Sequence, residues 1–149
     1  MEIKLIANNK KDFLDLLLMA DEQESMIDAY LERGDLFALY DGDLKSVCVV
    51  TDEGNGLFEI QNIATDKKYQ QQGYGRKLIL YIFDYYKDKC KTMLVGTGDV
   101  PEMRKFYEGC GFVYSHKIKN YFIEHYDHPM FENGVMLCDK IYFAKNRYI

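Results

Sequence analysis

Along the 149-residue chain, the spacing of apolar residues changes repeatedly between the pattern of a strand and the pattern of a helix. Short apolar runs predict strands at 3–7, 36–40, 44–51, 57–65, 92–97, 112–118 and 135–144. Apolar residues three and four apart predict helices at 12–31, broken near Asp21, and then at 75–89 and 101–108. Residues 120–134 follow neither period, and we expect them to form an irregular aromatic segment.

Turn residues separate these runs and set the class of the fold. Asp41-Gly42 predicts a tight hairpin between two strands, and Pro101 suits the first turn of a helix. The succession of hairpins and helical crossovers predicts a mixed α/β fold, with a twisted sheet of about seven strands and helices on both faces. Because the chain shows no internal repeat, low-complexity tract or linker, we expect residues 1–149 to form a single domain.

The most informative stretch is the glycine turn at 70–76, Gln-Gln-Gln-Gly-Tyr-Gly-Arg. It follows an apolar strand and opens an apolar-periodic helix. Glycines at 73 and 75 let the backbone approach a ligand without a Cβ in the way. The free N–H groups and positive dipole end of the helix then favour an anion. The turn therefore predicts a pyrophosphate site, as in a protein that uses coenzyme A or a nucleotide.

Other phosphate motifs fit this turn less well. A dinucleotide-binding turn would place a third glycine at position 78, where Leu78 stands. A P-loop requires Gly-Lys followed by Ser or Thr, which is missing from the chain. A glycine turn that merely starts a helix remains the alternative without a ligand.

Composition and charge narrow the classes of partner. Apolar residues make up 48% of the chain, as in a globular protein, and the net charge of −5 argues against a general nucleic-acid binder. The same negative charge would tolerate a cationic substrate. No apolar run approaches the length of a membrane span, and the first residues lack a secretory-signal pattern, so we expect no membrane partner and a cytoplasmic location.

Cysteine and histidine give little support for metal or redox chemistry. The four cysteines are widely spaced and form no C-x-x-C pair, which predicts reduced and mostly buried thiols. His125 and His128 suggest a metal site, but their spacing is wrong for a helical zinc motif, and Pro129 disfavours a regular helix. We expect no metal, and we expect the aromatic residues of 120–134 to shape a substrate pocket.

Two local sequences resemble the motifs of the GNAT acetyltransferase superfamily. The first is Ile63-Ala64-Thr65, then four residues, then Gln70-x-x-Gly73-x-Gly75, which is similar to the acetyl-CoA signature. The second, residues 106–112, resembles the Tyr-Glu-x-x-Gly-Phe stretch of the family's second motif. The likeness covers about residues 3–144, and residues 121–134 are also similar to the tails of small bacterial members whose substrates are unsettled.

The resemblance implies the GNAT fold and transfer of an acetyl group from acetyl-CoA to a primary amine. In the family, the pantetheine arm pairs with the fourth strand, which here assigns it to Ile63, Ala64 and Thr65. The pyrophosphate would lie on the turn formed by Gln70, Gln71, Gln72, Gly73, Tyr74, Gly75 and Arg76. The acceptor stays open between a small amine and a protein amine.

The resemblance also suggests two catalytic residues. Glu59 lies eleven residues before Gln70, at the distance of the catalytic glutamate in the family's histone acetyltransferases, so it is a candidate general base, directly or through water. Its alternative role is a solvent-facing strand residue. Tyr107 matches the tyrosine that protonates the departing thiolate in many members, and its alternative role is a buried helix aromatic.

Asp99 departs from the family pattern, because many members carry Asn near this point, in contact with the pantetheine. Asp99 would contact the coenzyme, act as another base, or cap the helix that starts at Pro101, and capping is the interpretation that its position favours.

The sequence therefore predicts an N-acetyltransferase in which the amine attacks acetyl-CoA directly in a ternary complex, without a covalent enzyme intermediate. The rival hypothesis is a module that binds acyl-CoA without catalysis. A homodimer is left open.

Overall fold

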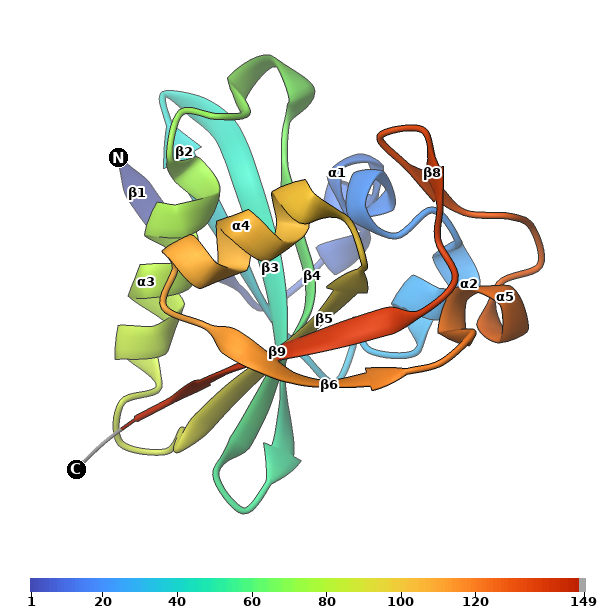
Figure 1. Ribbon diagram of the computed structural model, residues 1–149. Coiled ribbons are helices and arrows are strands. Elements are labelled where there is room, and N and C mark those ends of the chain that lie inside the picture. The colour runs from blue at the N-terminus through green and yellow to red at the C-terminus, as the bar shows by residue number, and fades with distance from the viewer. Residues whose placement is uncertain (148–149) are drawn as a thin grey trace.

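The computed structural model describes residues 1–147, which build a seven-stranded mixed sheet flanked by helices (Figure 1). In spatial order the strands are β1 (Glu2–Ile6), β2 (Asp35–Asp41), β3 (Asp43–Gly54), β4 (Leu57–Thr65), β5 (Thr92–Gly98), β9 (Lys140–Asn146) and β6 (Val113–Ile118). Neighbouring strands run antiparallel except β4 and β5, which are parallel. The predicted mixed α/β fold with about seven strands is confirmed.

The helices are η1 (Lys10–Phe13), α1 (Leu14–Ala20), α2 (Glu24–Asp28), η2 (Lys67–Tyr69), α3 (Tyr74–Tyr85), α4 (Pro101–Gly109) and α5 (Tyr121–His125), where η marks a 3-10 helix. The break predicted near Asp21 is confirmed, because α1 ends at Ala20 and α2 starts at Glu24. Pro101 is the first residue of α4, as its missing N–H allows.

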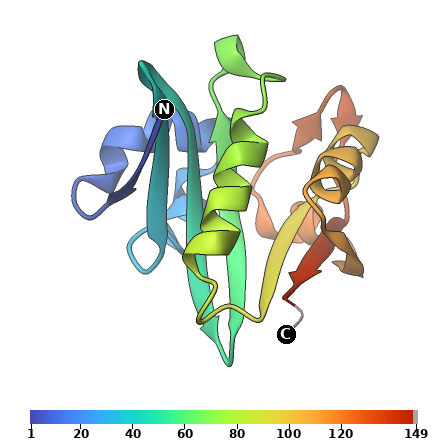
Figure 2. The ribbon, with the colours of Figure 1, turned by 90° about the vertical axis from the view of Figure 1, so that its left-hand side faces the viewer.

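Two hydrophobic cores place the helices on opposite faces of the sheet. Leu78, Ile79 and Ile82 of α3 pack with strand residues on one face, where Tyr107 of α4 also lies. Leu16 and Leu17 of α1 pack on the other face, together with residues that follow α2. Figure 2 shows α3 in front of the strands, with the blue helices of the N-terminal part beyond them. The prediction of helices on both faces is confirmed.

The parallel strands β4 and β5 pair only over their first halves. Residues 57–60 of β4 lie opposite residues 92–95 of β5, and no pairing follows. From Asn62 onward β4 stays paired with β3, while β5 stays paired with β9 through Gly98. The facing edges of the two strands therefore diverge in the middle of the sheet (Figure 2).

A β-bulge at Gln61 changes the direction of the β4 side chains. Val50 pairs with Ile60 and Val49 pairs with Asn62, so Gln61 is an extra residue without a partner on β3. Before the bulge, Ile60 faces α3; after it, Ile63 packs against the same core, whereas Asn62 faces α1. Even-numbered residues of β4 therefore face α3 before the bulge and α1 after it.

The C-terminal part differs from the prediction. Residues 135–136 form β8 (Val135–Met136), which pairs with β7 (Phe131–Glu132) in a separate hairpin, and the predicted strand 135–144 is wrong before Lys140. The expectation that 120–134 is wholly irregular is also wrong, since α5 lies within it. The turn at Asn133 and Gly134, both with positive φ, closes the hairpin before the chain returns to the sheet.

The chain order also gave no sign that β9 would lie between β5 and β6, which separates those two strands in space.

All four cysteines are free, and Cys48, Cys90 and Cys110 are buried while Cys138 is exposed, which confirms the prediction of reduced, mostly buried thiols. Within residues 1–147, no helix has the length and apolar character needed to cross a bilayer.

Candidate active site

A cavity of about 980 Å³ opens where β4 and β5 diverge. This volume is at the upper end of the range of ligand pockets in proteins. One wall, the glycine-turn side, consists of residues 63–76 and α4. The opposite wall, the acidic side, is formed by residues 19–33 and by the 119–139 segment, and it includes Asp21, Glu22 and Glu132.

The glycine turn presents an uncapped helix start to the cavity. Gly73 is the N-cap of α3 with φ of 87°, and no side chain caps the helix. Gln71 also has a positive φ of 61°, so the turn depends on two residues in the left-handed region. The first N–H groups of α3 are left free of protein side chains, which is the arrangement that binds phosphate oxygens.

The two glycines of the turn serve different purposes. A Cβ added at Gly73 would meet nothing within 4 Å, so Gly73 is needed for its φ. Gly75 has no positive φ, but a Cβ there would lie 3.2 Å from Cζ of Phe106. Gly75 therefore allows α3 and α4 to approach each other. The Gln70 side-chain amide donates a hydrogen bond of 3.1 Å to the Thr65 carbonyl, which ties the turn to the end of β4.

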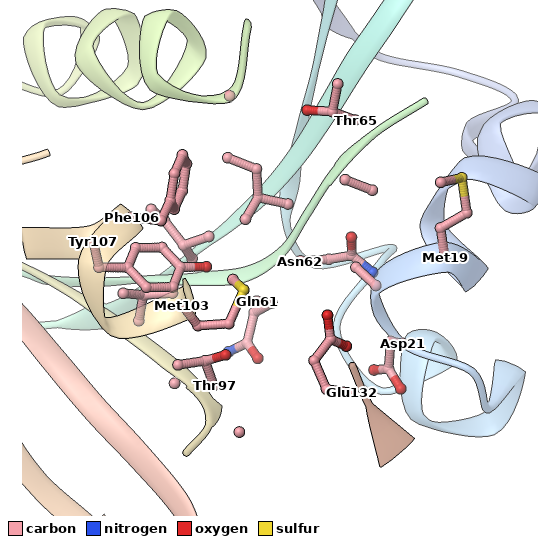
Figure 3. A pocket seen from close by; sticks show the side chains of 18 of the residues that line it. Met19, Asp21, Gln61, Asn62, Thr65, Thr97, Met103, Phe106, Tyr107 and Glu132 are labelled. Carbon is pink, nitrogen blue, oxygen red and sulfur yellow. The ribbon is translucent and has the colours of Figure 1, made fainter. Parts of the chain in front are cut away.

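Tyr107 is almost fully buried, with 2% of its surface exposed, yet it lines the cavity. Figure 3 shows its hydroxyl pointing from α4 into the space bordered by Gln61, Asn62 and Glu132. Burial raises the pKa of Tyr107 above its usual value, so the phenol keeps its proton at neutral pH. Within residues 1–147 the hydroxyl forms no hydrogen bond, and it is free to donate one to a ligand.

Most of the predicted binding residues lie together on the cavity wall. They are Ile63, Ala64, Thr65, Gln70, Gln71, Gly73, Tyr74, Gly75 and Arg76. Gln72 belongs to the same turn but does not line the cavity. The backbone edge of residues 61–65 that faces β5 has no strand partner, so its N–H and C=O groups, apart from the Thr65 carbonyl that accepts from Gln70, are available to an extended ligand.

Glu59 lies outside the cavity wall, two residues before Gln61, which lines it. Its side chain is partly buried, and burial raises its pKa above the usual glutamate value, with Lys140 acting in the opposite direction. Gln61 donates a hydrogen bond of 3.1 Å to the Thr51 hydroxyl, and Thr51 pairs with Glu59 across β3 and β4. Any contact between Glu59 and a cavity ligand therefore needs an intervening group.

Asp99 also lies off the cavity wall, and it does not cap α4. Its carboxylate instead accepts a hydrogen bond of 2.8 Å from Nε of Arg104, one turn into the helix, and this partner lowers the pKa of Asp99. Val100 occupies the N-cap position. The predicted cap is wrong because Asp99 lies one residue before the N-cap, and its carboxylate pairs with Arg104 instead of with the helix N–H groups.

The acidic side is organised around the buried carboxylate of Asp21. It accepts hydrogen bonds from the hydroxyls of Tyr30, at 3.1 Å, and Tyr126, at 2.8 Å. Burial raises the pKa of Asp21, although both hydroxyls act to lower it. The Asn62 amide donates to the Tyr30 hydroxyl at 3.0 Å and to the Leu17 carbonyl at 3.0 Å, which extends the network to the bulged strand.

The 119–139 segment is attached to the α1–α2 junction by side-chain contacts. Besides the Tyr126–Asp21 bond, the Asp127 N–H donates to Oε1 of Gln23 at 3.1 Å, and His128 lies 3.5 Å from Glu22. In Figure 1 this red and orange segment lies beside the helices α1 and α2. The aromatic residues Tyr121, Phe122 and Tyr126 all line the cavity, as expected for a substrate pocket.

Sequence reasoning missed Asp21, Glu132 and Lys140, which all line the cavity. None of them lies in a recognisable motif, and Asp21 is far along the chain from the other two. Asp21 begins a polar, mostly acidic run and Lys140 follows Asp139, so neither stands out from its neighbours in the sequence. Among residues 1–147, no group of three or more His, Cys, Asp or Glu side chains is arranged to hold a metal ion.

Comparisons with known proteins agree with this geometry. A family model described as "Acetyltransferase (GNAT) domain" matches residues 32–114, which is more than half of the chain. The chain is also 33% identical, over 144 residues, to "Uncharacterized N-acetyltransferase YvbK" of Bacillus subtilis, covering 95% of this chain and 93% of that protein.

Two solved structures share the fold over nearly their whole length. One is a Bacillus subtilis acetyltransferase in complex with CoA, with a TM-score of 0.90, 31% identity and 99% coverage of both chains. The other is a GNAT family acetyltransferase from Elizabethkingia anophelis with acetyl-CoA bound, with a TM-score of 0.90 and 30% identity over 98% of this chain and 97% of that one.

Proposed function

The chain belongs to the GNAT acetyltransferase family and is an acetyl-CoA-dependent acyltransferase, and from this premise we propose that it acetylates a primary amine by direct attack in a ternary complex. One observation carries the proposal: an uncapped helix start, an unpaired strand edge and the Tyr107 hydroxyl all border one cavity. The helix start would bind a phosphate, the strand edge would pair with an amide-containing arm, and the hydroxyl would protonate a departing thiolate.

The glycine-turn side supports a binding mode for the coenzyme. The pyrophosphate lies against the free N–H groups at the start of α3, and Arg76 adds a positive charge on the same wall. The pantetheine amides pair with the free edge of Ile63, Ala64 and Thr65 in the manner of an added strand. The related structures named above contain CoA and acetyl-CoA, which supports this assignment of the ligand.

Amine acetylation requires a neutral amine. An alkyl ammonium with a pKa of about 10.4 costs roughly 4–5 kcal/mol to deprotonate at neutral pH, so a general base accelerates the reaction. We propose that Glu59 takes this proton through water, because Glu59 does not line the cavity, whereas Gln61, two residues further along β4, does. Partial burial raises its pKa, which makes it a better base than an ordinary surface glutamate.

Tyr107 is proposed as the acid that completes the reaction. The neutral amine forms a bond to the thioester carbonyl carbon, and the backbone amide near Ile63 stabilises the negative charge that develops on the oxygen. The carbon–sulfur bond then breaks, and its electron pair leaves on sulfur. Tyr107 donates its proton to that thiolate, since its phenol stays protonated at neutral pH and its hydroxyl has no protein partner among residues 1–147. The acetylated nitrogen gives up its extra proton to solvent, and solvent returns a proton to the Tyr107 phenolate.

Direct attack, without an acetyl-enzyme, is supported by the positions of the thiols. Cys48, Cys90 and Cys110 are buried, and burial raises the pKa of each thiol, which disfavours the nucleophilic thiolate. No cysteine is among the cavity-lining residues in the described part of the chain. A ternary complex therefore predicts intersecting initial-rate plots when the amine and acetyl-CoA are varied together, and parallel plots would contradict it.

The function is tested by following the release of free CoA thiol while acetyl-CoA is titrated against a panel of small amines and peptides. We expect thiol release that depends on the amine, together with saturable binding of acetyl-CoA measured by calorimetry. Tight binding without any amine-dependent thiol, across both small and peptide amines, would favour the rival hypothesis of a binding module and overturn the proposed acceptor class.

A further inference from the structure

We propose that Lys140 binds a carboxylate of the acceptor, so that the enzyme prefers amines that also carry a carboxylate over polyamines and simple alkylamines. The inference rests on the proposed function, because it assigns the second recognition point of the same acceptor. It depends on where Lys140 lies, on what surrounds its ammonium group, and on which partners that group lacks.

Lys140 begins β9 and lines the cavity next to two aromatic rings. Its Nζ lies 4.5 Å from the centroid of the Tyr121 ring and 5.1 Å from that of the Tyr142 ring. Tyr121 comes from the 119–139 segment and Tyr142 from the sheet, so the ammonium group is held between the two. Cation–π contacts of this kind restrict the long side chain to one place.

Glycine on the neighbouring strand makes room for this arrangement. Gly98 pairs with Lys140 and Gly96 pairs with Tyr142 across β5 and β9. A Cβ added at Gly96 would overlap the Lys140 side chain and would come within 2.8 Å of the Tyr142 ring. The stem of Lys140 therefore lies flat over β5 at the point where β5 diverges from β4, which directs the ammonium group into the cavity.

Apart from the two aromatic rings, the ammonium group has no protein partner among residues 1–147. No carboxylate lies within 4.0 Å of Nζ, and Nζ donates no hydrogen bond. Burial lowers the pKa of Lys140, while the more distant charges of Glu59 and Asp21 raise it. Since a partly buried cation is stabilised by a hydrogen-bonded anion, three unused N–H donors in a substrate cavity point to an anionic group of the ligand.

A carboxylate suits this position better than a second ammonium group. Two other charged groups of this wall are already engaged: Asp21 is bonded to two tyrosines, and Arg33 is paired with Glu53 at 2.9 Å. A polyamine would bring a further cation against Lys140, and like charges in a partly buried site repel. Glu132 lines the same cavity and would attract the amine end of an amino carboxylate.

The test compares ω-amino carboxylates of three to six carbons with their carboxamides and with diamines of the same length, in the thiol-release assay. For the wild-type enzyme we expect kcat/KM for the best carboxylate to exceed that for its carboxamide and for the diamine by at least about tenfold. Lys140→Met keeps the length of the stem without the charge, and it should abolish this ratio while leaving the Kd of acetyl-CoA unchanged.

Lys117→Met is the matched control, because Lys117 lies on β6 outside the cavity and its loss changes the net charge equally. It should leave the ratio intact. A wild-type preference for diamines, or a Lys140→Met variant that lowers kcat/KM equally for carboxylates and carboxamides, would overturn the inference. The second result would show that Lys140 acts only on Glu59 or on the fold.

Calorimetric binding of 5-aminopentanoate and of its carboxamide separates this inference from the proposed function. If no amine releases thiol, but the carboxylate binds the wild-type protein at least about tenfold more tightly than it binds Lys140→Met, the proposed reaction fails and the anion site stands. If both ligands bind the two proteins equally, the anion site is excluded, whatever the activity.

Discussion

The two walls of the cavity are built by different means. The glycine-turn side is made mainly from one continuous stretch, residues 63–76, with α4 beside it, and the groups that we propose bind the coenzyme are mostly backbone N–H groups whose direction is set by Gly73 and by the start of α3. The acidic side is made from side chains of distant segments, joined through Asp21, Tyr30 and Tyr126. A backbone site depends on local conformation, whereas a side-chain site depends on how remote parts of the chain pack.

This difference bears on what each wall recognises. The diphosphate and amide groups of a coenzyme are constant, so a rigid backbone surface is sufficient for them. Acceptors differ from one another in shape and charge. Side chains can match those differences, because they can change without altering the backbone that carries them. Family members can therefore keep one wall and change the other.

The largest expected effect comes from Tyr107, which lies between the two walls. Tyr107→Phe should lower kcat by on the order of 10³-fold, because the departing thiolate loses its proton donor. The Kd of acetyl-CoA should stay within about twofold, since the ring and its packing remain. Stopped assays of thiol release and calorimetry measure the two quantities. Unchanged kcat would remove Tyr107 from the mechanism and leave it as a buried aromatic.

Glu59→Gln should lower kcat/KM by on the order of 10²-fold at neutral pH. The base acts only when ionised, and burial raises the pKa of Glu59, so kcat/KM should fall on acidification at a higher pH than an ordinary glutamate would give. The variant should lose this acid limb of the pH profile. An acid limb that persists in Glu59→Gln would assign the base to another group or to solvent.

Gly73→Ala tests whether the glycine-turn side depends on backbone conformation. An alanine held at a φ of 87° costs roughly 1–2 kcal/mol, so the turn should relax and the Kd of acetyl-CoA should rise about tenfold. Gly54→Ala is the matched control: Gly54 has a φ of 89°, is equally uncrowded, and lies at the other end of β4. It should reduce thermal stability without changing the Kd of acetyl-CoA.

Tyr126→Phe should have the smallest effect, and it tests the acidic side. It removes the hydrogen bond between the 119–139 segment and Asp21, which contributes about 1 kcal/mol, so the KM of the amine should rise about fivefold. Tyr30→Phe removes the other hydrogen bond to the same carboxylate, together with the bond that Tyr30 accepts from Asn62, without touching that segment, and it should change this KM less. A rise in the Kd of acetyl-CoA in Tyr126→Phe would show that the walls are coupled.

The sequence predicted the glycine-turn side well because its signals are local. The strand at 57–65, the glycine turn around position 73 and the helix after it follow from neighbouring residues and turn chemistry. Tyr107 was found in the same way, through a short motif on one helix. Whether these residues bind and react as proposed is decided by the experiments above.

The acidic side was poorly predicted because its contacts span long stretches of chain. Tyr126 and Asp21 are 105 residues apart, and nothing in the pattern around either residue indicates the other. The strand predicted at 135–144 was wrong at its start for a similar reason: Val135 and Met136 are apolar, but they form a small exposed hairpin that only tertiary contacts select. Asp99 shows that a local capping signal can also fail, because its carboxylate pairs with Arg104 and does not cap α4.

The single extra residue at Gln61 has a consequence for how this protein could change over evolution. Deleting it would leave Asn62 opposite Val49, facing α1, and Ile63 opposite Cys48, facing the layer under α3, so both side chains would keep their faces. The loss would instead fall on the backbone, because β4 would no longer have the local bend and extra twist that a bulge gives a strand at the point where β4 leaves β5. A protein that depends on such an insertion tolerates many point changes nearby and almost no change in the length of this strand.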